Sequence, residues 1–256
     1  MPVTLVRRLA FTSTAQPDSS LEWLVTNGLG GYASETVSGE LTRRFHGLLI
    51  SALPAPLGRM MILNQLRSTL HSNGRVFALD GETRRDTGEE TTGLVEFRLE
   101  MGLPVWRYEF EGVVFEKRLL MPYLQNSVHV IYRLLQAERP VRLTLRPMVH
   151  IRPHEGSLGP LLPESYSFVA TDEGYEISAG ADMPSLRMLV YAPRSEVIIE
   201  SRHIMSQEYA LELRRGYPHV GQLWSPGYIA IAMDDPEAAF VASTEPWETI
   251  RALTPR

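Results

Sequence analysis

The sequence predicts an all-β protein, a large antiparallel β-sandwich of the supersandwich type with little helix. Hydrophobic and polar residues alternate along much of the 256-residue chain, as in Val141–Arg146, and this period of two places one face of a strand against a core. The 18 prolines and 19 glycines are spread throughout and leave little room for helices. Many short strand-like segments with frequent turn signals are typical of a sandwich.

Strand candidates follow one another along the chain. Trp23–Leu49 predicts a strand–loop–strand unit, because a glycine-rich turn and a polar loop separate its apolar residues. Met101–Pro104 and Thr171–Gly174 are hairpin-type connections. The other strands are expected at Val3–Phe11, Arg59–Leu66, Val76–Leu79, Val95–Glu100, Val105–Glu111, Val113–Met121, Ser127–Leu135, Val141–Arg146, Tyr166–Ala170, Tyr175–Ala179, Leu186–Ala192, Val197–Ser201, Tyr228–Met233 and Phe240–Ser243.

Two segments do not follow a simple strand pattern. Gln207–Arg215 is the best helix candidate, but its polar and apolar residues alternate, so a strand fits at least as well. Arg152–Glu164 contains three prolines and two glycines; it is long for a hairpin loop and could cover a face of the sheet. The chain shows no internal repeat or interior linker, so residues 1–256 are expected to form one domain.

Composition argues against several classes of protein. The net charge of −5 argues against a protein that binds nucleic acid. The chain has no cysteine, which excludes disulfides and thiolate metal sites. No apolar run approaches the roughly 18 residues of a membrane helix, and the N-terminus lacks the apolar core of a secretory signal. A cytoplasmic location without membrane contact is therefore expected.

Familiar catalytic patterns do not match the chain. Gly28–Gly31 lacks the spacing of nucleotide-binding loops, and no P-loop lysine follows it. His150 and His154 are four residues apart, but Pro153 disrupts a helical pairing of metal ligands. A glycosidase needs two carboxyl groups beside the scissile bond, and chain positions cannot identify such a pair. We therefore predict no catalytic residue, no metal site and no cofactor.

A polar surface is predicted within Trp23–Leu49. Its glycines permit positive φ and close approach of the backbone, so the Asn27–Tyr32 loop is expected to pack beside Thr42–Gly47. Two readings of the arginine pair stay open: a planar donor fork for a ligand or partner domain, or bonds within the sandwich that only hold the loop. The candidate residues for contact with a substrate or another domain are Asn27, Gly28, Gly30, Gly31, Tyr32, Thr42, Arg43, Arg44, Phe45 and His46.

The segment Trp23–Leu63 carries a long, irregular motif. It contains Trp-Leu-x-Thr-Asn-Gly-x-Gly-Gly-Tyr, then Thr-Arg-Arg-Phe-His-Gly-Leu-Leu, then a proline-rich turn and Gly-Arg. In this respect it resembles the opening block of bacterial and archaeal glycogen debranching enzymes of the amylo-α-1,6-glucosidase type, in which tyrosine usually stands in place of Phe45. Later segments fit too, among them Phe115–Lys117, Leu145–Pro147, Arg214–Gly216 and Leu223–Gly227. Residues 220–223 and 152–154 depart from the family pattern.

The resemblance implies a function. In full-length relatives this block is the N-terminal β-sandwich, and the catalytic carboxylates belong to a following (α/α)6 barrel. We therefore expect a non-catalytic domain that supports binding of an α-glucan, such as glycogen or limit dextrin, and the active site of a barrel supplied in cis or in trans. The barrel is expected to be absent from this chain. The alternatives are a free-standing carbohydrate-binding sandwich and an independent hydrolase with an unrecognised carboxylate pair.

Overall fold

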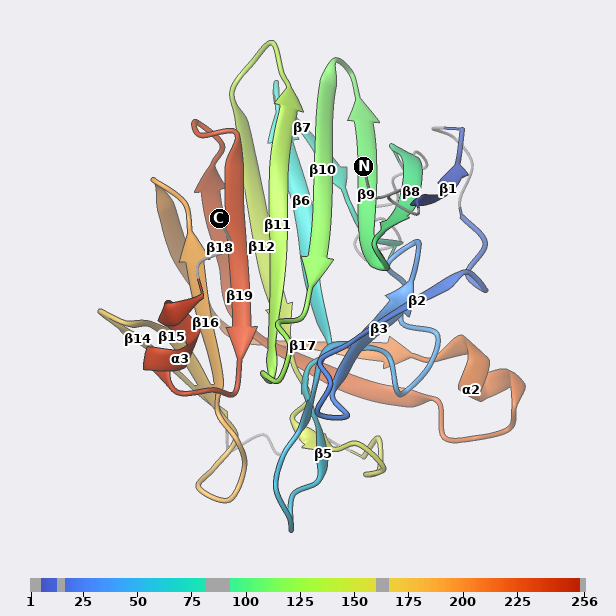
Figure 1. The fold of residues 1–256 in the computed structure, drawn as a ribbon, viewed down its shortest axis with the longest axis vertical. Helices are drawn as coiled ribbons and strands as arrows, with labels where there is room; N and C mark the ends of the chain where they lie inside the picture. Colours follow the sequence, from blue (N-terminus) through green and yellow to red (C-terminus); the bar gives the residue numbers. More distant parts are fainter. Residues whose placement is uncertain (1–5, 13–16, 82–92, 160–165, 254–256) are drawn as a thin grey trace.

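Antiparallel sheets dominate the computed structural model, which describes residues 6–12, 17–81, 93–159 and 166–253 (Figure 1). The large sheet has nine strands, in the order β1 (Val6–Ala10), β8 (Leu94–Glu100), β9 (Leu103–Phe110), β10 (Val113–Leu120), β11 (Ser127–Gln136), β19 (Glu237–Ser243), β16 (Leu186–Tyr191), β15 (Gly174–Ser178) and β14 (Ser167–Thr171). Each strand is antiparallel to its neighbours, which confirms the predicted fold class.

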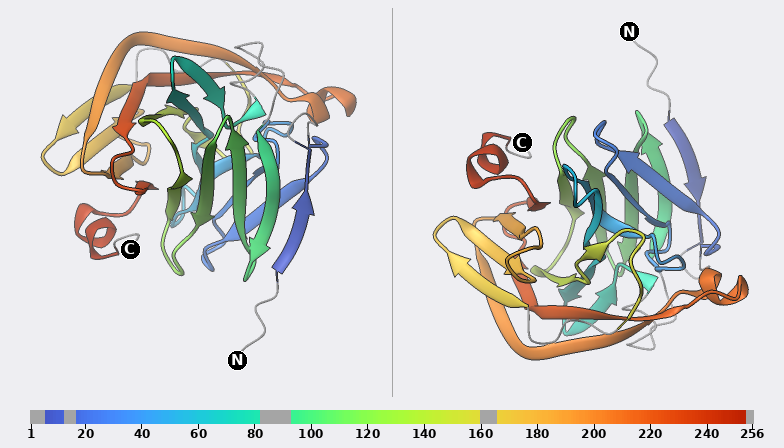
Figure 2. Two further views of the ribbon diagram at one scale, coloured as in Figure 1. Left: turned by 90° about the horizontal axis from the view of Figure 1, so that it is seen from above. Right: turned by 90° about the horizontal axis from the view of Figure 1, so that it is seen from below.

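Two five-stranded sheets complete the sandwich. The second sheet, in the order β17 (Ser195–Glu208), β18 (Val220–Ala232), β12 (Val141–Met148), β6 (Gln65–Ser72) and β7 (Arg75–Ala78), lies behind the large sheet in Figure 1. The third sheet has the order β13 (Arg152–Pro153), β5 (Arg59–Leu63), β4 (Gly47–Ala52), β3 (Tyr32–Thr36) and β2 (Glu22–Thr26). Two short helices, α2 (Ala210–Arg214) and α3 (Trp247–Ala252), lie at opposite ends of the molecule (Figure 2).

The core forms where the apolar faces of the sheets meet. Along β12, Val141, Leu143 and Leu145 are buried and alternate with more exposed residues, as the period of two predicts. Tyr132 of the large sheet is fully buried, and its hydroxyl lies 2.9 Å from Oγ of Ser68 in the second sheet. This contact links the two sheets and gives the buried Tyr132 hydroxyl a hydrogen-bond partner.

Two tryptophans join the third sheet to the large sheet. The rings of Trp23 and Trp106 pack edge to face with their centroids 5.3 Å apart. The indole nitrogen of Trp106 donates a hydrogen bond to the carbonyl of Val37 at 3.0 Å. Buried aromatic contacts therefore hold the third sheet against the large sheet. Such pairs stabilise a protein by more than the burial of their apolar area alone.

One predicted strand is two strands in the structure. Arg59–Leu66 was expected to be continuous, but β5 ends at Leu63 and β6 begins at Gln65. Asn64 separates them because its amide donates to the carbonyl of Met148 and its Oδ1 accepts the amide of His150 at 2.6 Å. The chain thus crosses from the third sheet to the second at Asn64, a buried residue whose backbone amide and Oδ1 both bond to the segment Met148–His150.

The Gln207–Arg215 segment contains both structures that its pattern allowed. Gln207 and Glu208 end β17, and α2 then occupies Ala210–Arg214. Tyr209 and Glu212 are buried while Leu213 is half-exposed. This short helix packs against the body of the protein through only part of its surface.

Strand β18 is longer than predicted. It begins at Val220 and passes through Pro226, whereas the sequence predicted a strand only from Tyr228. Proline has no amide to donate to a ladder, and the register of β17 against β18 shifts between Ile199 and His203, opposite this site. The irregularity accommodates the proline.

Other boundaries differ at the limits of the description. The predicted Trp23–Leu49 unit contains β2, β3 and the start of β4, so it holds three strands rather than two. The first residues of the predicted Val3–Phe11 strand and residues 160–164 of the predicted long loop lie outside the described residues. The described part of that loop begins with β13, which pairs with β5. Helix α3 was not predicted.

Candidate functional site

A depression with both polar and apolar side chains lies on the outer face of the β2–β3 hairpin. Residues of β2 alternate between exposed and buried positions, so Trp23 and Val25 enter the core while their neighbours face outward. The depression has a volume of about 420 Å³. We call it the β2–β3 depression; it is lined by Glu22, Leu24, Thr26, Gly30, Gly31, Tyr32, Ser34, Arg43, Phe45, His46 and Arg59.

The turn between β2 and β3 is shaped by Asn27 from within. Its Oδ1 accepts the amides of Leu29 and Gly31, each at 3.0 Å. Gly28 and Gly30 have φ of 80° and 98°, a conformation that glycine adopts at low cost. A Cβ atom at Gly31 would lie 2.7 Å from the carbonyl oxygen of Ile50. The predicted close backbone approach is thus present, but Asn27 itself is fully buried and does not face the depression.

His46 holds the loop that forms one rim of the depression. Its Nδ1 lies 3.2 Å from the amide of Thr42 and 3.4 Å from the amide of Arg43, and accepts from both. Burial lowers the pKa of His46 to about 4, so the imidazole is neutral near pH 7. Because Nδ1 accepts, the proton lies on Nε2, which is 3.4 Å from Oε1 of Glu22.

Glu22 is the one carboxylate among the described residues that line the depression. Nε of Arg43 donates to Oε1 of Glu22 at 2.6 Å. The carboxylate is therefore shared by a guanidinium and the Nε2 side of His46. Glycosidases of the common two-carboxylate type require a second carboxyl group at roughly 5–10 Å, and the lining supplies none.

Arg44 turns away from the depression. Its Nη2 donates to the carbonyl of Glu155 at 3.2 Å, and its guanidinium lies 4.8 Å from the centroid of the Phe45 ring. The Phe45 ring also stacks on His154, with centroids 4.7 Å apart. Arg152 donates to the carbonyl of Arg44 at 2.6 Å. These contacts are all internal and hold the loop in one shape.

Tyr32 connects the floor of the depression to this stack. Its hydroxyl lies 3.0 Å from the carbonyl of Phe45 and 2.8 Å from Nε2 of His154. Burial raises the pKa of Tyr32 and lowers the pKa of His154. Both groups are consequently neutral at pH 7, and they act here as hydrogen-bonding groups.

Arg59 contributes a cation at the opposite rim. Its Nε donates to the carbonyl of Gly30 at 2.8 Å, which positions the guanidinium beside the turn. No ion pair in the described part of the chain involves Arg59. Its charge is therefore not neutralised by a neighbouring described carboxylate, unlike that of Arg43.

The predicted residues divide into two groups. Gly30, Gly31, Tyr32, Arg43, Phe45 and His46 line the depression together, whereas Asn27, Gly28, Thr42 and Arg44 are not part of its lining. Sequence reasoning missed Glu22, Leu24 and Thr26, although the alternation along Glu22–Thr26 was a usable signal. It also missed Arg59 and Arg152. Arg152 meets this loop across more than 100 residues of sequence, and no local pattern signals that contact.

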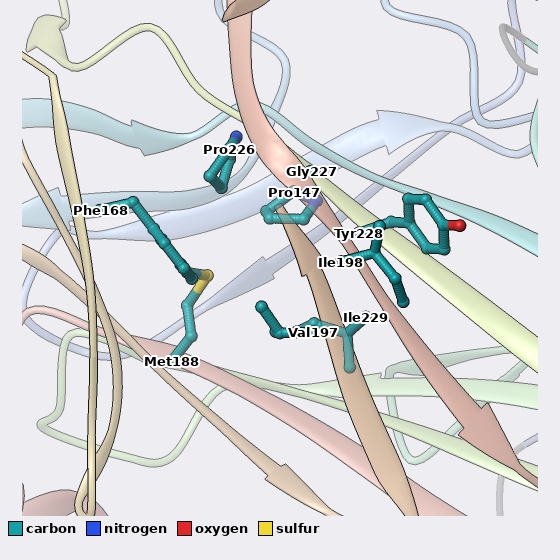
Figure 3. A pocket seen from close by; sticks show the side chains of 9 residues that line it. All are labelled: Pro147, Phe168, Met188, Val197, Ile198, Pro226, Gly227, Tyr228 and Ile229. Carbon is teal, nitrogen blue, oxygen red and sulfur yellow. The ribbon is translucent and has the colours of Figure 1, made fainter. Parts of the chain in front are cut away.

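A second hollow has a different character. It lies between β12, β14, β16, β17 and β18, and Figure 3 shows the apolar side chains around it, including Phe168, Met188 and Val197. The hydroxyl of Tyr228 points away from the other labelled side chains (Figure 3). The hollow has a volume of about 10 Å³, which is the space that a single water molecule needs. It is a packing gap between sheets rather than a site for a polar ligand.

The described ranges contain neither a candidate membrane-spanning helix nor a candidate metal cluster. None of the helices there is long and apolar enough to cross a bilayer. No cluster of three or more histidine, aspartate or glutamate side chains there is arranged to hold a metal ion.

Comparisons with known proteins give one extensive match. A family model described as the N-terminal region of glycogen debranching enzyme matches residues 21–240. Among solved structures, the chain is similar to a bacterial glucoamylase complexed with acarbose, with 10% sequence identity and a TM-score of 0.38. That alignment covers 96% of this chain and 37% of the glucoamylase, so the chain spans little more than a third of the length of that enzyme. A search of curated proteins found no significant match.

Proposed function

The chain belongs to the family of glycogen debranching enzyme N-terminal domains, and from this premise we propose that it is a single non-catalytic domain acting in the cytoplasm. Its proposed role is to support α-glucan binding and the active site of an (α/α)6 barrel, in the same polypeptide or in a partner chain. Glycogen and its limit dextrins are the proposed substrates of the assembled enzyme.

The β2–β3 depression is the observation that carries this proposal. It combines hydrogen-bonding groups of fixed orientation, namely Tyr32, Arg43 and Arg59, with the apolar surface of Leu24 and Phe45. Sugars present both hydroxyls and apolar C–H faces, and sites for small polar ligands combine the same two kinds of surface. The guanidinium of Arg59 is the group best placed to donate to a glucan hydroxyl, because no described carboxylate competes for it.

The arrangement of carboxylates in the depression supports a non-catalytic role for this domain. Hydrolysis of a glycosidic bond generally uses an acid and a second carboxylate that activates water or attacks the sugar. In the depression, Glu22 is already bonded to Arg43 at 2.6 Å. We therefore assign the catalytic pair to the barrel.

The proposal can be tested by glucose release from a limit dextrin. The assay compares the 256-residue chain, a glycogen debranching barrel domain, and the two joined in one polypeptide. We expect no release from the chain alone and the highest rate from the joined protein. Arg59→Ala in the joined protein should raise the KM for limit dextrin about tenfold with little change in kcat, since one charge-assisted hydrogen bond is lost.

A matched variant controls for nonspecific loss of charge. Arg107 lies on β9 of the large sheet and pairs with Glu109 at the surface, so Arg107→Ala should leave KM unchanged. Release of glucose by the chain alone, abolished by replacing one of its own acidic residues, would overturn the proposal. Strong glucan binding by the chain combined with no influence on the barrel would instead favour a free-standing carbohydrate-binding module.

A further inference from the structure

An exposed aromatic side chain stands on the turn that borders the depression. Tyr123, in the connection between β10 and β11, is 78% exposed, and the neighbouring Leu124 is 52% exposed. A Cβ atom built on Gly28 would lie 2.6 Å from Cε2 of Tyr123. The tyrosine ring therefore rests directly against the backbone of Gly28, and most of its surface faces solvent.

The backbone that carries Tyr123 is held in place by hydrogen bonds. Leu124 has φ of 59°, which is unusual for a residue other than glycine, and its amide donates to the carbonyl of Asn27 at 2.7 Å. Nδ2 of Asn27 donates to the carbonyl of Gln125 at 2.9 Å. Side-chain and backbone groups of Asn126 and Ala52 exchange two further bonds, each of 2.9 Å. A residue with a strained backbone conformation persists only where the surrounding structure holds it firmly, as these hydrogen bonds do here.

The same turn joins Tyr123 to the β2–β3 depression. Thr26 and Gly30 line the depression, and Gly28, under the ring of Tyr123, lies midway between them in sequence. Figure 1 shows the β10–β11 connection next to the turn between β2 and β3. An extended ligand in the depression that continues over the turn would meet the tyrosine ring.

We propose that Tyr123 is a stacking platform for one glucose ring of an α-glucan whose neighbouring units occupy the β2–β3 depression. The face of an aromatic ring carries partial negative charge, and it attracts the partially positive C–H groups on the apolar face of a glucopyranose. Tyrosine offers such a surface at low entropic cost, and a ring already fixed on Gly28 loses little further freedom on binding. The proposal rests on the glucan-binding role proposed above and adds a residue and a binding mode to it.

The size of the exposed apolar surface favours a sugar chain over a protein. A stable protein interface covers roughly 800 Å² on each partner. Around the turn and in the adjoining depression, the exposed large apolar side chains are Tyr123, Leu124, Leu29 and Leu24, too few for such an interface, and hydrogen-bonding side chains such as Arg43 and Arg59 stand beside them. One ring beside a row of hydrogen-bonding groups matches the alternation of apolar faces and hydroxyls along a glucan.

The test measures binding of maltoheptaose to the 256-residue chain by isothermal titration calorimetry. Tyr123→Ala should raise the Kd about tenfold, as expected for loss of one aromatic contact, with an unchanged unfolding midpoint. Tyr123→Phe keeps the ring and should bind as the wild type does. Tyr217→Ala removes another tyrosine, 58% exposed in the connection between α2 and β18, and should not alter the Kd.

The outcomes separate this inference from the proposed function. Binding of maltoheptaose that Tyr123→Ala does not weaken overturns the platform and leaves the domain role untouched. Absence of binding by the wild-type chain also overturns the platform, while the glucose-release assay on the joined protein still decides the domain role. In that assay, the Tyr123→Ala variant could show a lower kcat with no increase in KM. This result would indicate that Tyr123 contacts the barrel rather than the glucan, and it would also overturn the platform.

Discussion

The hydroxyl of Tyr32 donates a hydrogen bond to the carbonyl oxygen of Phe45, at a distance of 3.0 Å. Tyr32 begins β3, and Phe45 belongs to the loop between β3 and β4. The bond therefore connects the floor of the β2–β3 depression to its rim. The shape of the depression depends on this hydrogen bond.

Tyr32→Phe removes the hydroxyl and its hydrogen bond but keeps the aromatic ring. The carbonyl of Phe45 and Nε2 of His154 each lose a partner in a partly buried place, so the free energy of unfolding should fall by about 1–2 kcal/mol. Urea denaturation would measure the change. Tyr217→Phe, at an exposed position, serves as the control and should have no effect. Equal midpoints for Tyr32→Phe and the wild type would contradict the prediction.

Gly31→Ala should be destabilising for a steric reason. The added Cβ would lie 2.7 Å from the carbonyl oxygen of Ile50 and 3.2 Å from the amide nitrogen of Ala52, and backbone atoms within a sheet cannot move aside cheaply. We expect a loss of about 1–3 kcal/mol, typical of overpacking. At Gly159 the nearest atom is 3.5 Å away, so Gly159→Ala should cost far less. The pair can be compared by thermal unfolding, and similar losses would disprove the steric account.

Stability should fall as the pH drops from about 6.5 to about 4. Burial lowers the pKa of His46, His129 and His150 to about 4 in the folded protein, against about 6.5 in an unfolded chain. Between these values the unfolded state binds protons that the folded state does not, so each such histidine contributes a slope of up to about 1.4 kcal/mol per pH unit. Stability is retained above pH 6.5 and lost below it.

His129→Leu isolates one of these contributions. The pKa shift of His129 comes from burial alone, and leucine has no proton to bind. The variant should show a flatter dependence of the unfolding free energy on pH between 4 and 6.5 than the wild type, measured by urea titration at several pH values. Parallel curves would show that His129 is protonated equally in both states.

Arg44→Ala should act mainly on stability. The guanidinium contacts the carbonyl of Glu155 and the ring of Phe45, so its removal should lower the free energy of unfolding by about 1–2 kcal/mol. In a joined two-domain enzyme, activity per folded molecule should stay close to normal. A large loss of activity with an unchanged melting temperature would instead place Arg44 at a ligand or at the barrel. Arg142→Ala, which removes an exposed surface pair with Glu196, is the control.

The architecture was predictable because its signals are local. Alternation along Val141–Arg146 shows directly which residues face the core, and the turn signals between strands are carried by neighbouring glycines and prolines. The break at Asn64 was not predictable in this way. It depends on the carbonyl of Met148, the last residue of β12, and on the amide of His150 just after that strand, and both are far from Asn64 in the sequence.

The candidate site was predictable only in part for the same reason. The motif around Gly28–Tyr32 and Thr42–His46 identifies the turn and the loop, but it does not show which side chains face outward. Asn27 faces the interior because its partner Asn126 lies 99 residues further along the chain. Arg44 is likewise held by Glu155, at a separation of 111 residues. Orientation at this surface is a tertiary property.

The packing of α2 against the loop after β3 has a consequence for the order of folding. The amide of Leu211 donates to the carbonyl of Thr42 at 2.9 Å, and Oε1 of Glu212 accepts the amide of Arg44 at 3.3 Å. These bonds close a chain segment of 168 residues, and contacts of such long range form slowly because loop closure costs entropy first. We therefore expect the rim of the depression to be completed late, after nearly the whole domain has been synthesised. A nascent chain in which α2 is still inside the ribosome would lack the completed rim of the β2–β3 depression.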